Sequence, residues 1–198
     1  IFNVSNVTGQ NIEILKTFLN KLEKRDNSVK VRNSLINFSK TNNFNNLFEI
    51  YNTYVVKGKG LIVYGLAKLG NFNLQDEFNI GPFSNGYIRV RIRSLHNDTR
   101  NDITCLKEGM YGCLCIKTVN NKDVLSKRML RRSKVITDYN NYSSEVSCSS
   151  IIGHHKTTIG ERYKSFFHSG NIGDAVTIVS SDNFPMRCRE HHKITFKF

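Results

Sequence analysis

From residue 47 onward the sequence breaks into short apolar segments, rich in β-branched and aromatic residues and bounded by Gly, Asn or Asp. The first group of segments spans 48–56, 61–66, 77–80, 87–95 and 111–119. Short strands at this spacing are typical of a small closed barrel. A second group follows at 144–152, 166–169, 174–180 and 193–198. The pattern therefore predicts a mainly β chain that forms two consecutive small β-barrels.

The N-terminal residues follow a different pattern. An apolar run ends at Ser5, a turn follows at Thr8 and Gly9, and apolar residues then recur at helical spacing from Ile12 to Leu22. This predicts one amphipathic α-helix over 10–24. Residues 26–46 are polar and rich in Asn, which predicts a linker with one short element around 35–38.

The charge balance favours an anionic partner. Lys and Arg number 29 against 16 Asp and Glu, for a formal net charge of +13. Nucleic acid is the first candidate, because each phosphate that a cation neutralises releases counterions. A basic protein with solvated charged faces is the alternative. The five cysteines show no CxxC spacing, which predicts reduced thiols, and no apolar run approaches membrane-spanning length.

Motifs in a fixed order run through most of the chain. They are the segment 54–65, the strand 74–82 that leads into Gly-Pro, the strand 91–96, the turn 107–112 and the stretch 122–128. Together they resemble the domain II barrel of translational GTPases, the family of elongation factor Tu. Residues 151–159, with Tyr163 and His168, resemble the first strands of domain III. The double His, the Thr-Thr-Ile run and the Val-Ser-Asn-Val-Thr-Gly run are most similar to the branch of GTP-binding proteins 1 and 2.

The resemblance implies a domain plan and a parent activity. Residues 1–25 would end a P-loop GTPase domain, 26–46 would be a linker, 47–140 domain II, and 141–198 an incomplete domain III. The parent would bind GTP and Mg²⁺, hydrolyse GTP and act in translation in the cytoplasm. These residues hold no GxxxxGK[ST] loop, and Asn120 to Asp123 lack the NKxD spacing. We therefore expect the chain alone to be a monomeric, inactive fragment that binds no cofactor.

The resemblance also places a guanine-binding turn at Ser5, Asn6 and Val7, where main-chain N–H groups of the family meet the base oxygen. A plain strand-to-helix turn is the alternative. The same family has acidic residues near positions 52 and 66–68, where this chain has Asn52, Leu66, Ala67 and Lys68.

Basic residues gather in two places. Arg89, Arg91 and Arg93 alternate with apolar residues, so that strand periodicity puts them on one face. A denser run lies where the two barrels would meet, and solvated surface is the alternative for both. By the resemblance, Tyr54 matches an aromatic near the terminal adenosine of tRNA, although it can equally pack in the barrel. The full set predicted to bind tRNA or ribosomal RNA is Tyr54, Lys59, Arg89, Arg91, Arg93, Lys127, Arg128, Arg131 and Arg132.

Protein docking is the alternative to RNA binding. Barrels of this kind also dock proteins, and a ribosomal or RNA-decay partner is the second candidate. The His and Cys residues predict no metal site, because they fall on separate predicted strands and adjacent His residues on a strand point to opposite faces. No nucleophile set of Ser, His and Asp or of Cys and His is indicated, so no catalytic residue is predicted.

Overall fold

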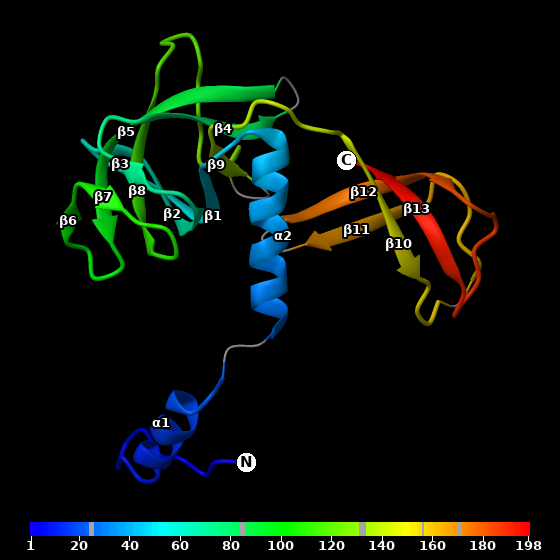
Figure 1. Ribbon diagram of the computed structural model, residues 1–198, viewed down its shortest axis with the longest axis horizontal. Coiled ribbons are helices and arrows are strands. Elements are labelled where there is room, and N and C mark those ends of the chain that lie inside the picture. Colours follow the sequence, from blue (N-terminus) through cyan, green and yellow to red (C-terminus); the bar gives the residue numbers. More distant parts are fainter. Residues whose placement is uncertain (24–25, 84–85, 131–133, 156, 170–171) are drawn as a thin grey trace. The chain divides into compact units, whose positions relative to one another are not determined.

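The computed structural model describes residues 1–23, 26–83, 86–130, 134–155, 157–169 and 172–198 (Figure 1). Its contacts divide the chain into two units, Ile1–Asn42 and Asn43–Phe198. The first unit contains the helices α1 and α2, and the second contains the strands β1 to β13. The mainly β character predicted from the short apolar segments is confirmed.

Helix α1 runs from Ile12 to Asn20, which is shorter than the predicted 10–24. Asn11 precedes it in a left-handed conformation, and Lys16 and Glu13 pair on the exposed side at 2.7 Å. The ring of Phe2 lies 4.9 Å from that of Phe18. None of the residues of α1 is buried, so its apolar side is only partly covered within the described residues.

Helix α2 occupies Asp26–Asn42, where the sequence predicted a linker with one short element. That secondary-structure prediction was wrong. The last turn is held by side chains, because Thr41 Oγ1 and Asn42 Nδ2 donate to the carbonyls of Asn37 and Phe38. Asn43 then takes a left-handed φ of 53°, a common way for a helix to end.

The first β body is a closed barrel. Its sheet has the order β4-β9-β1-β2-β8-β5-β6, and an additional pairing of β4 with β5 joins the two sides. The short strand β9 pairs with both β1 and β4, so it completes the ring. The strands are β1 Leu47–Val56, β2 Gly60–Leu69, β3 Phe72–Asn73, β4 Glu77–Phe83, β5 Gly86–Asn97, β6 Asp102–Ile103, β7 Cys105–Leu106, β8 Tyr111–Thr118 and β9 Val135–Thr137.

The barrel interior is filled by apolar side chains from every long strand. On β5, Val90 and Ile92 are fully buried while Arg89 and Arg91 are exposed, as the alternating pattern predicted. Phe48 packs on Phe72 with ring centroids 5.6 Å apart. Fully buried core residues are Phe48, Val63, Phe72, Ile80, Val90, Ile92, Leu106, Leu114 and Ile136.

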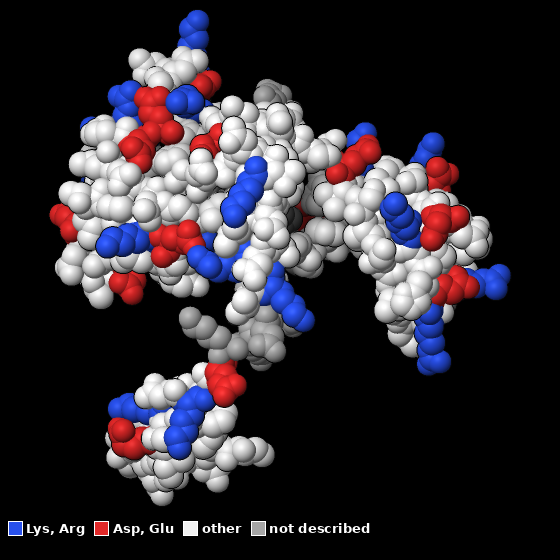
Figure 2. All heavy atoms as spheres, in the orientation of Figure 1, with Lys and Arg blue, Asp and Glu red and all other residues white. Residues whose placement is uncertain are grey.

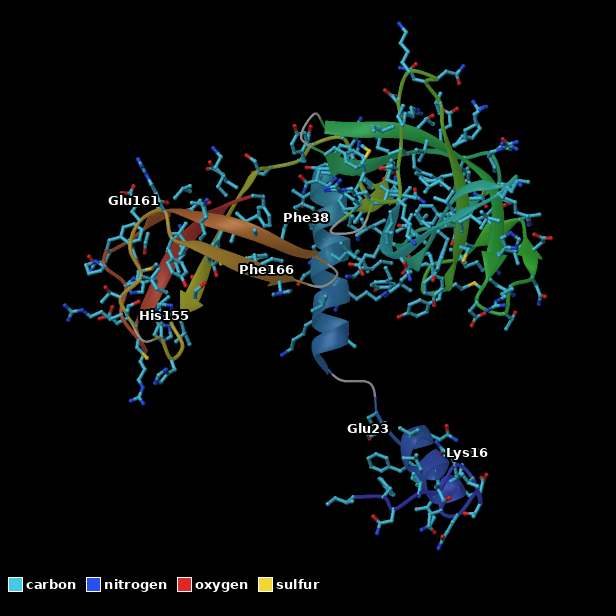
Figure 3. The ribbon with its side chains drawn as sticks, turned by 180° about the vertical axis from the view of Figure 1, so that it is seen from behind. Lys16, Glu23, Phe38, His155, Glu161 and Phe166 are labelled. Atoms are coloured by element: carbon cyan, nitrogen blue, oxygen red, sulfur yellow. The ribbon has the colours of Figure 1, made fainter. Side chains whose placement is uncertain are left out.

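The second β body is an open four-stranded sheet with the order β10-β13-β12-β11. Its strands are β10 Glu145–Ile151, β11 Lys164–Ser169, β12 Ile172–Ser181 and β13 His191–Lys197. A small core of Ile152, Ile159, Ile178, Met186 and Ile194 packs against one face. His155, in the loop before β11, contacts the hydroxyl of Tyr163 at 3.2 Å, and Phe166 stands half-exposed on β11 (Figure 3).

A buried histidine at the start of β13 contacts both ends of the connection between β12 and β13. His192 is 6% exposed, and its Nδ1 lies 2.9 Å from Asp182 Oδ1 while its Nε2 lies 3.2 Å from Glu190 Oε2. Both nitrogens can donate at once in the imidazolium form alone. The hydrogen bond to Asp182 raises the pKa of His192, and it lowers the pKa of Asp182 to about 2. The charged ring therefore bridges two carboxylates.

We expect this bridge to make stability depend on pH. A raised pKa in the folded state adds stability below the ordinary His value near 6.5, and that stability is lost as pH rises through the folded pKa. In thermal melts from about pH 5.5 to about pH 9, His192→Gln should therefore cost most at the acidic end and least at the basic end. His191→Gln, on the exposed neighbour, is the control. A loss from His192→Gln that is the same at every pH would contradict the bridge.

Candidate functional site

Two residues of the predicted RNA-binding set meet on the barrel surface. Tyr54, on β1, is 44% exposed, and Lys127 Nζ lies 6.0 Å from the centre of its ring. Asn52 Nδ2 donates to the Tyr54 hydroxyl at 3.0 Å, which fixes the ring at the surface. Tyr54 thus presents a partly exposed aromatic ring beside a cation.

A hollow of about 240 Å³ lies beside this pair. It is lined by Tyr51, Asn52, Thr53, Lys127 and Leu130. Thr53 is 2% exposed, and its Oγ1 has no hydrogen-bond partner among the described residues. A buried hydroxyl without a partner is costly, because it loses its hydration and gains nothing in exchange. Thr53 lines the hollow, but its hydroxyl oxygen has less than 1 Å² of exposed surface, so Tyr54 and Lys127 are the groups here that a ligand can reach.

The arginine stripe on β5 is partly neutralised. Glu77 on β4 accepts from Arg89 Nε at 3.0 Å and from Arg91 Nε at 3.0 Å on its other oxygen. These hydrogen bonds, from Arg91 first and then Arg89, hold the pKa of Glu77 below its ordinary value. Lys117 lies opposite Arg91 on β8. Two arginines thus share one carboxylate beside Lys117, which leaves a positive cluster that is weaker than the sequence suggested.

The other predicted residues lie apart from these clusters. Arg93 is exposed but lines a separate groove, because the β5–β8 register shifts between Ile92 and Ser94. Lys59 sits in the β1–β2 hairpin, where its carbonyl accepts from the Cys115 thiol, and Arg128 is exposed. Arg131 and Arg132 fall outside the residues that the structure describes.

The predicted guanine turn forms a compact loop in the first unit. Gly9 N donates to the Ser5 carbonyl at 2.9 Å, and Thr8 N donates to Ser5 Oγ at 3.2 Å. Ser5 lines a hollow of about 530 Å³ with residues 2–4, 10 and 11, whereas Val7 is 96% exposed. The turn thus leads from an irregular segment at residues 1–5 into α1.

Sequence reasoning missed a cluster of tyrosines on the strands β1, β2 and β8. Tyr64 stacks on Tyr111 at 6.3 Å, and Tyr51 lies 6.1 Å from Tyr111. The hydroxyl of Tyr51 donates to Glu49 at 3.0 Å, and burial followed by the Glu49 charge raises the pKa of Tyr51 to about 12. Lys68 pairs with the same carboxylate at 2.5 Å. The sequence signal for this cluster was Lys68, which stands close to where the resembled family has an acidic residue.

Positive and negative side chains alternate on the face of the molecule that Figure 2 shows. On that face the basic side chains are therefore interspersed with acidic groups. Neither helix in the described part of the chain combines the length and apolar character that crossing a membrane requires. Within the same residues, no three His, Cys, Asp or Glu side chains come together as metal ligands.

The chain was compared with known proteins. No family model matches it. GTP-binding protein 1 of Xenopus laevis is 28% identical over 199 aligned residues, which cover 100% of this chain and 28% of that protein. GTP-binding protein 2 of Mus musculus and of Homo sapiens is 23% identical over 179 residues, which cover 90% of this chain and 28% of each relative. The chain thus spans less than a third of the length of these curated relatives.

Among solved structures, translation elongation factor SelB from Methanococcus maripaludis, in its apo form, aligns with a TM-score of 0.58. The alignment covers 98% of this chain and 41% of that one, at 16% identity, so it shows the fold alone. The order of barrel and open sheet is thereby matched to a translation factor, as the motifs implied. The chain is homologous to a part of GTP-binding proteins 1 and 2, and its β-rich portion has the fold of translation-factor domains.

Proposed function

We propose that this chain is part of a GTP-binding translation factor and that its barrel binds structured RNA, either tRNA or ribosomal RNA. The observation that carries the proposal is the exposed ring of Tyr54 beside Lys127, next to a hollow that Asn52 and Thr53 line. An aromatic face and a cation offer a nucleotide one contact each for its base and its phosphate.

The magnitudes favour Tyr54 as the main contact. Stacking of a base on an aromatic ring contributes about 1–3 kcal/mol. Lys127 adds one neutralised phosphate, which steepens the salt dependence. A second basic cluster, formed by Arg89, Arg91 and Lys117, should contribute less to RNA affinity, because Glu77 already pairs with both arginines. We propose Lys59 and Arg128 as further phosphate contacts, on their exposure alone.

Filter binding of tRNA from about 50 to 200 mM salt tests the proposal. Tyr54→Ala should weaken binding by about tenfold with little change in salt slope, since stacking is uncharged. Lys127→Glu should weaken binding and flatten the slope by about one unit or more. Lys164→Glu, on β11, changes the charge equally and is the control. If all three variants bind alike, the Tyr54 surface does not bind RNA.

Two further variants separate this surface from general charge. Thr53→Val keeps the shape of the side chain and removes a hydroxyl that has almost no exposed surface, so the fold should be no less stable and tRNA affinity should not change. Arg89→Glu together with Arg91→Glu should flatten the salt slope less than two full phosphate contacts would, because Glu77 holds both arginines. A full loss of two units of slope would show that Glu77 releases its arginines when RNA binds.

We further propose that the whole protein binds GTP with Mg²⁺, and that Ser5, Asn6 and Val7 form its guanine turn. The homology to GTP-binding proteins 1 and 2 supports this, and so do the main-chain hydrogen bonds that hold the turn. The proposed domains are 1–25, 26–46, 47–140 and 141–198. Calorimetry on this chain alone should detect no guanosine-specific binding tighter than about 100 µM, because the turn offers few contacts.

A further inference from the structure

A groove opens in the barrel where β5 changes partners. The backbone of Ile92 bonds with Gln75 and Asp76, next to the start of β4, whereas Leu95 pairs with Ile103 on β6. Arg93 and Ser94 lie between these two pairings and line the groove. Its volume is about 650 Å³, which is within the range of sites that bind drug-sized ligands or a few side chains.

The lining has an apolar part and a charged part. Leu74, which is 42% exposed, and the partly buried Ile103 supply apolar surface, with Leu95 buried beneath. Arg93 and Lys107 supply two exposed cations. Within the described ranges neither has a carboxylate at ion-pair distance, in contrast to Arg89 and Arg91. A pair of cations that make no ion pair, beside an apolar surface, is complementary to a ligand with acidic and apolar groups close together.

The same lining disfavours a nucleic acid strand. Asp102 is part of the groove, and its side chain is 88% exposed even though it pairs with His96 at 3.0 Å. A nucleic acid brings a phosphate with every nucleotide, so one would meet this carboxylate. A peptide can place an uncharged residue there and keep its carboxylates for Arg93 and Lys107.

We propose that this groove docks a short segment of a protein partner that carries Asp or Glu beside Leu, Ile or Phe. The apolar side chain lies on Leu74 and Ile103, and the carboxylates pair with Arg93 and Lys107. This docking site is separate from the Tyr54 surface and does not depend on the proposed RNA binding. The chain therefore offers two interaction surfaces with different chemistry, one for RNA and one for an acidic, apolar peptide.

Fluorescence anisotropy with a short fluorescein-labelled peptide, in which Asp and Glu alternate with Leu and Phe, tests the proposal. We expect a dissociation constant of about 10–100 µM. Two control peptides replace the acids by Asn and Gln, or the apolar residues by Ser, and both should bind about tenfold more weakly. Arg93→Glu with Lys107→Glu should weaken binding of the acidic peptide by at least about tenfold.

Matched variants keep the test specific. Lys122→Glu lies in a turn outside the groove and should bind the peptide as the unaltered chain does. Leu74→Asn keeps both cations and should weaken binding, and a thermal melt checks that each variant folds. Tyr54→Ala should leave peptide binding unchanged while it weakens tRNA binding, so the two proposals fail separately. Equal affinity for the three peptides would overturn the docking site. So would a competition in which tRNA displaces the peptide, if the variant with Arg93→Glu and Lys107→Glu also loses both ligands equally.

Discussion

Replacing Gly65 by alanine is expected to destabilise the barrel by about 3 kcal/mol or more, at or above the usual cost of overpacking. An added Cβ would lie 1.9 Å from the Glu49 carbonyl oxygen and 2.9 Å from a ring carbon of Phe48. The oxygen belongs to the backbone of β1 and cannot rotate away. To make room, β1 would have to separate from β2 at the point where their register already shifts.

Urea unfolding monitored by circular dichroism measures this loss. Gly160→Ala is the control, because nothing lies within 4 Å of the Cβ that it would add. The midpoint of Gly65→Ala should fall clearly below those of the control and the unaltered chain. Equal midpoints would mean that the close approach of the two strands relaxes freely. Gly65 thus lies where the backbones of β1 and β2 approach each other closely.

Replacing Lys68 by methionine should cost about 2 kcal/mol, because it leaves a mostly buried carboxylate without its cation. The Glu49 side chain is 11% exposed and that of Lys68 is 30% exposed, with 2.5 Å between Nζ and Oε1. The hydroxyl of Tyr51 remains as a donor to Glu49. A single neutral hydrogen bond does not replace a charge pair in this surrounding.

The double variant with Glu49→Gln distinguishes charge from packing. The amide oxygen can still accept from Tyr51 and carries no charge, so adding Glu49→Gln should restore most of the stability that Lys68→Met removes. Lys57→Met, on an exposed lysine of the hairpin, should change stability by less than about 0.5 kcal/mol. A double variant that is less stable than Lys68→Met would show that the cost arises from packing.

The longer strands could be predicted, and the shortest could not. Each strand of six or more residues had been expected near its observed position, because alternating side chains mark its buried and exposed faces. The strands β3, β6, β7 and β9 contain two or three residues each. Such a segment shows no periodicity, and it becomes a strand because its pairing partner is brought to it by the rest of the fold.

Helix α2 was missed for a different reason. Its sequence is rich in Asn and has weak helical periodicity, both of which favour a loop by composition. The available signal lay at its end, where Asn43 follows Thr41 and Asn42. Asn tolerates the left-handed conformation that ends a helix, so this run marks a C-terminal cap.

The candidate site was predictable residue by residue but not as an arrangement. Tyr54 and Lys127 were both singled out, yet their proximity depends on how the segment after β8 returns to β1. The alternating pattern correctly predicted that Arg89 and Arg91 are exposed on one face, but it did not predict that Glu77 pairs with both. That carboxylate joins them through the register of β4 and β5, which sequence periodicity does not fix.

The three residues of β9 set the order of events during synthesis. The strand β9 is the pairing partner of Leu47–Glu49 on β1 and of Asn79–Gly81 on β4. The barrel therefore cannot close on the ribosome until residue 137 has emerged. At ~5–20 residues per second, β1 and β4 spend several seconds with open edges. A strand of this length therefore determines how long the nascent chain is exposed to mispairing, and a pause in translation before residue 135 would prolong that exposure.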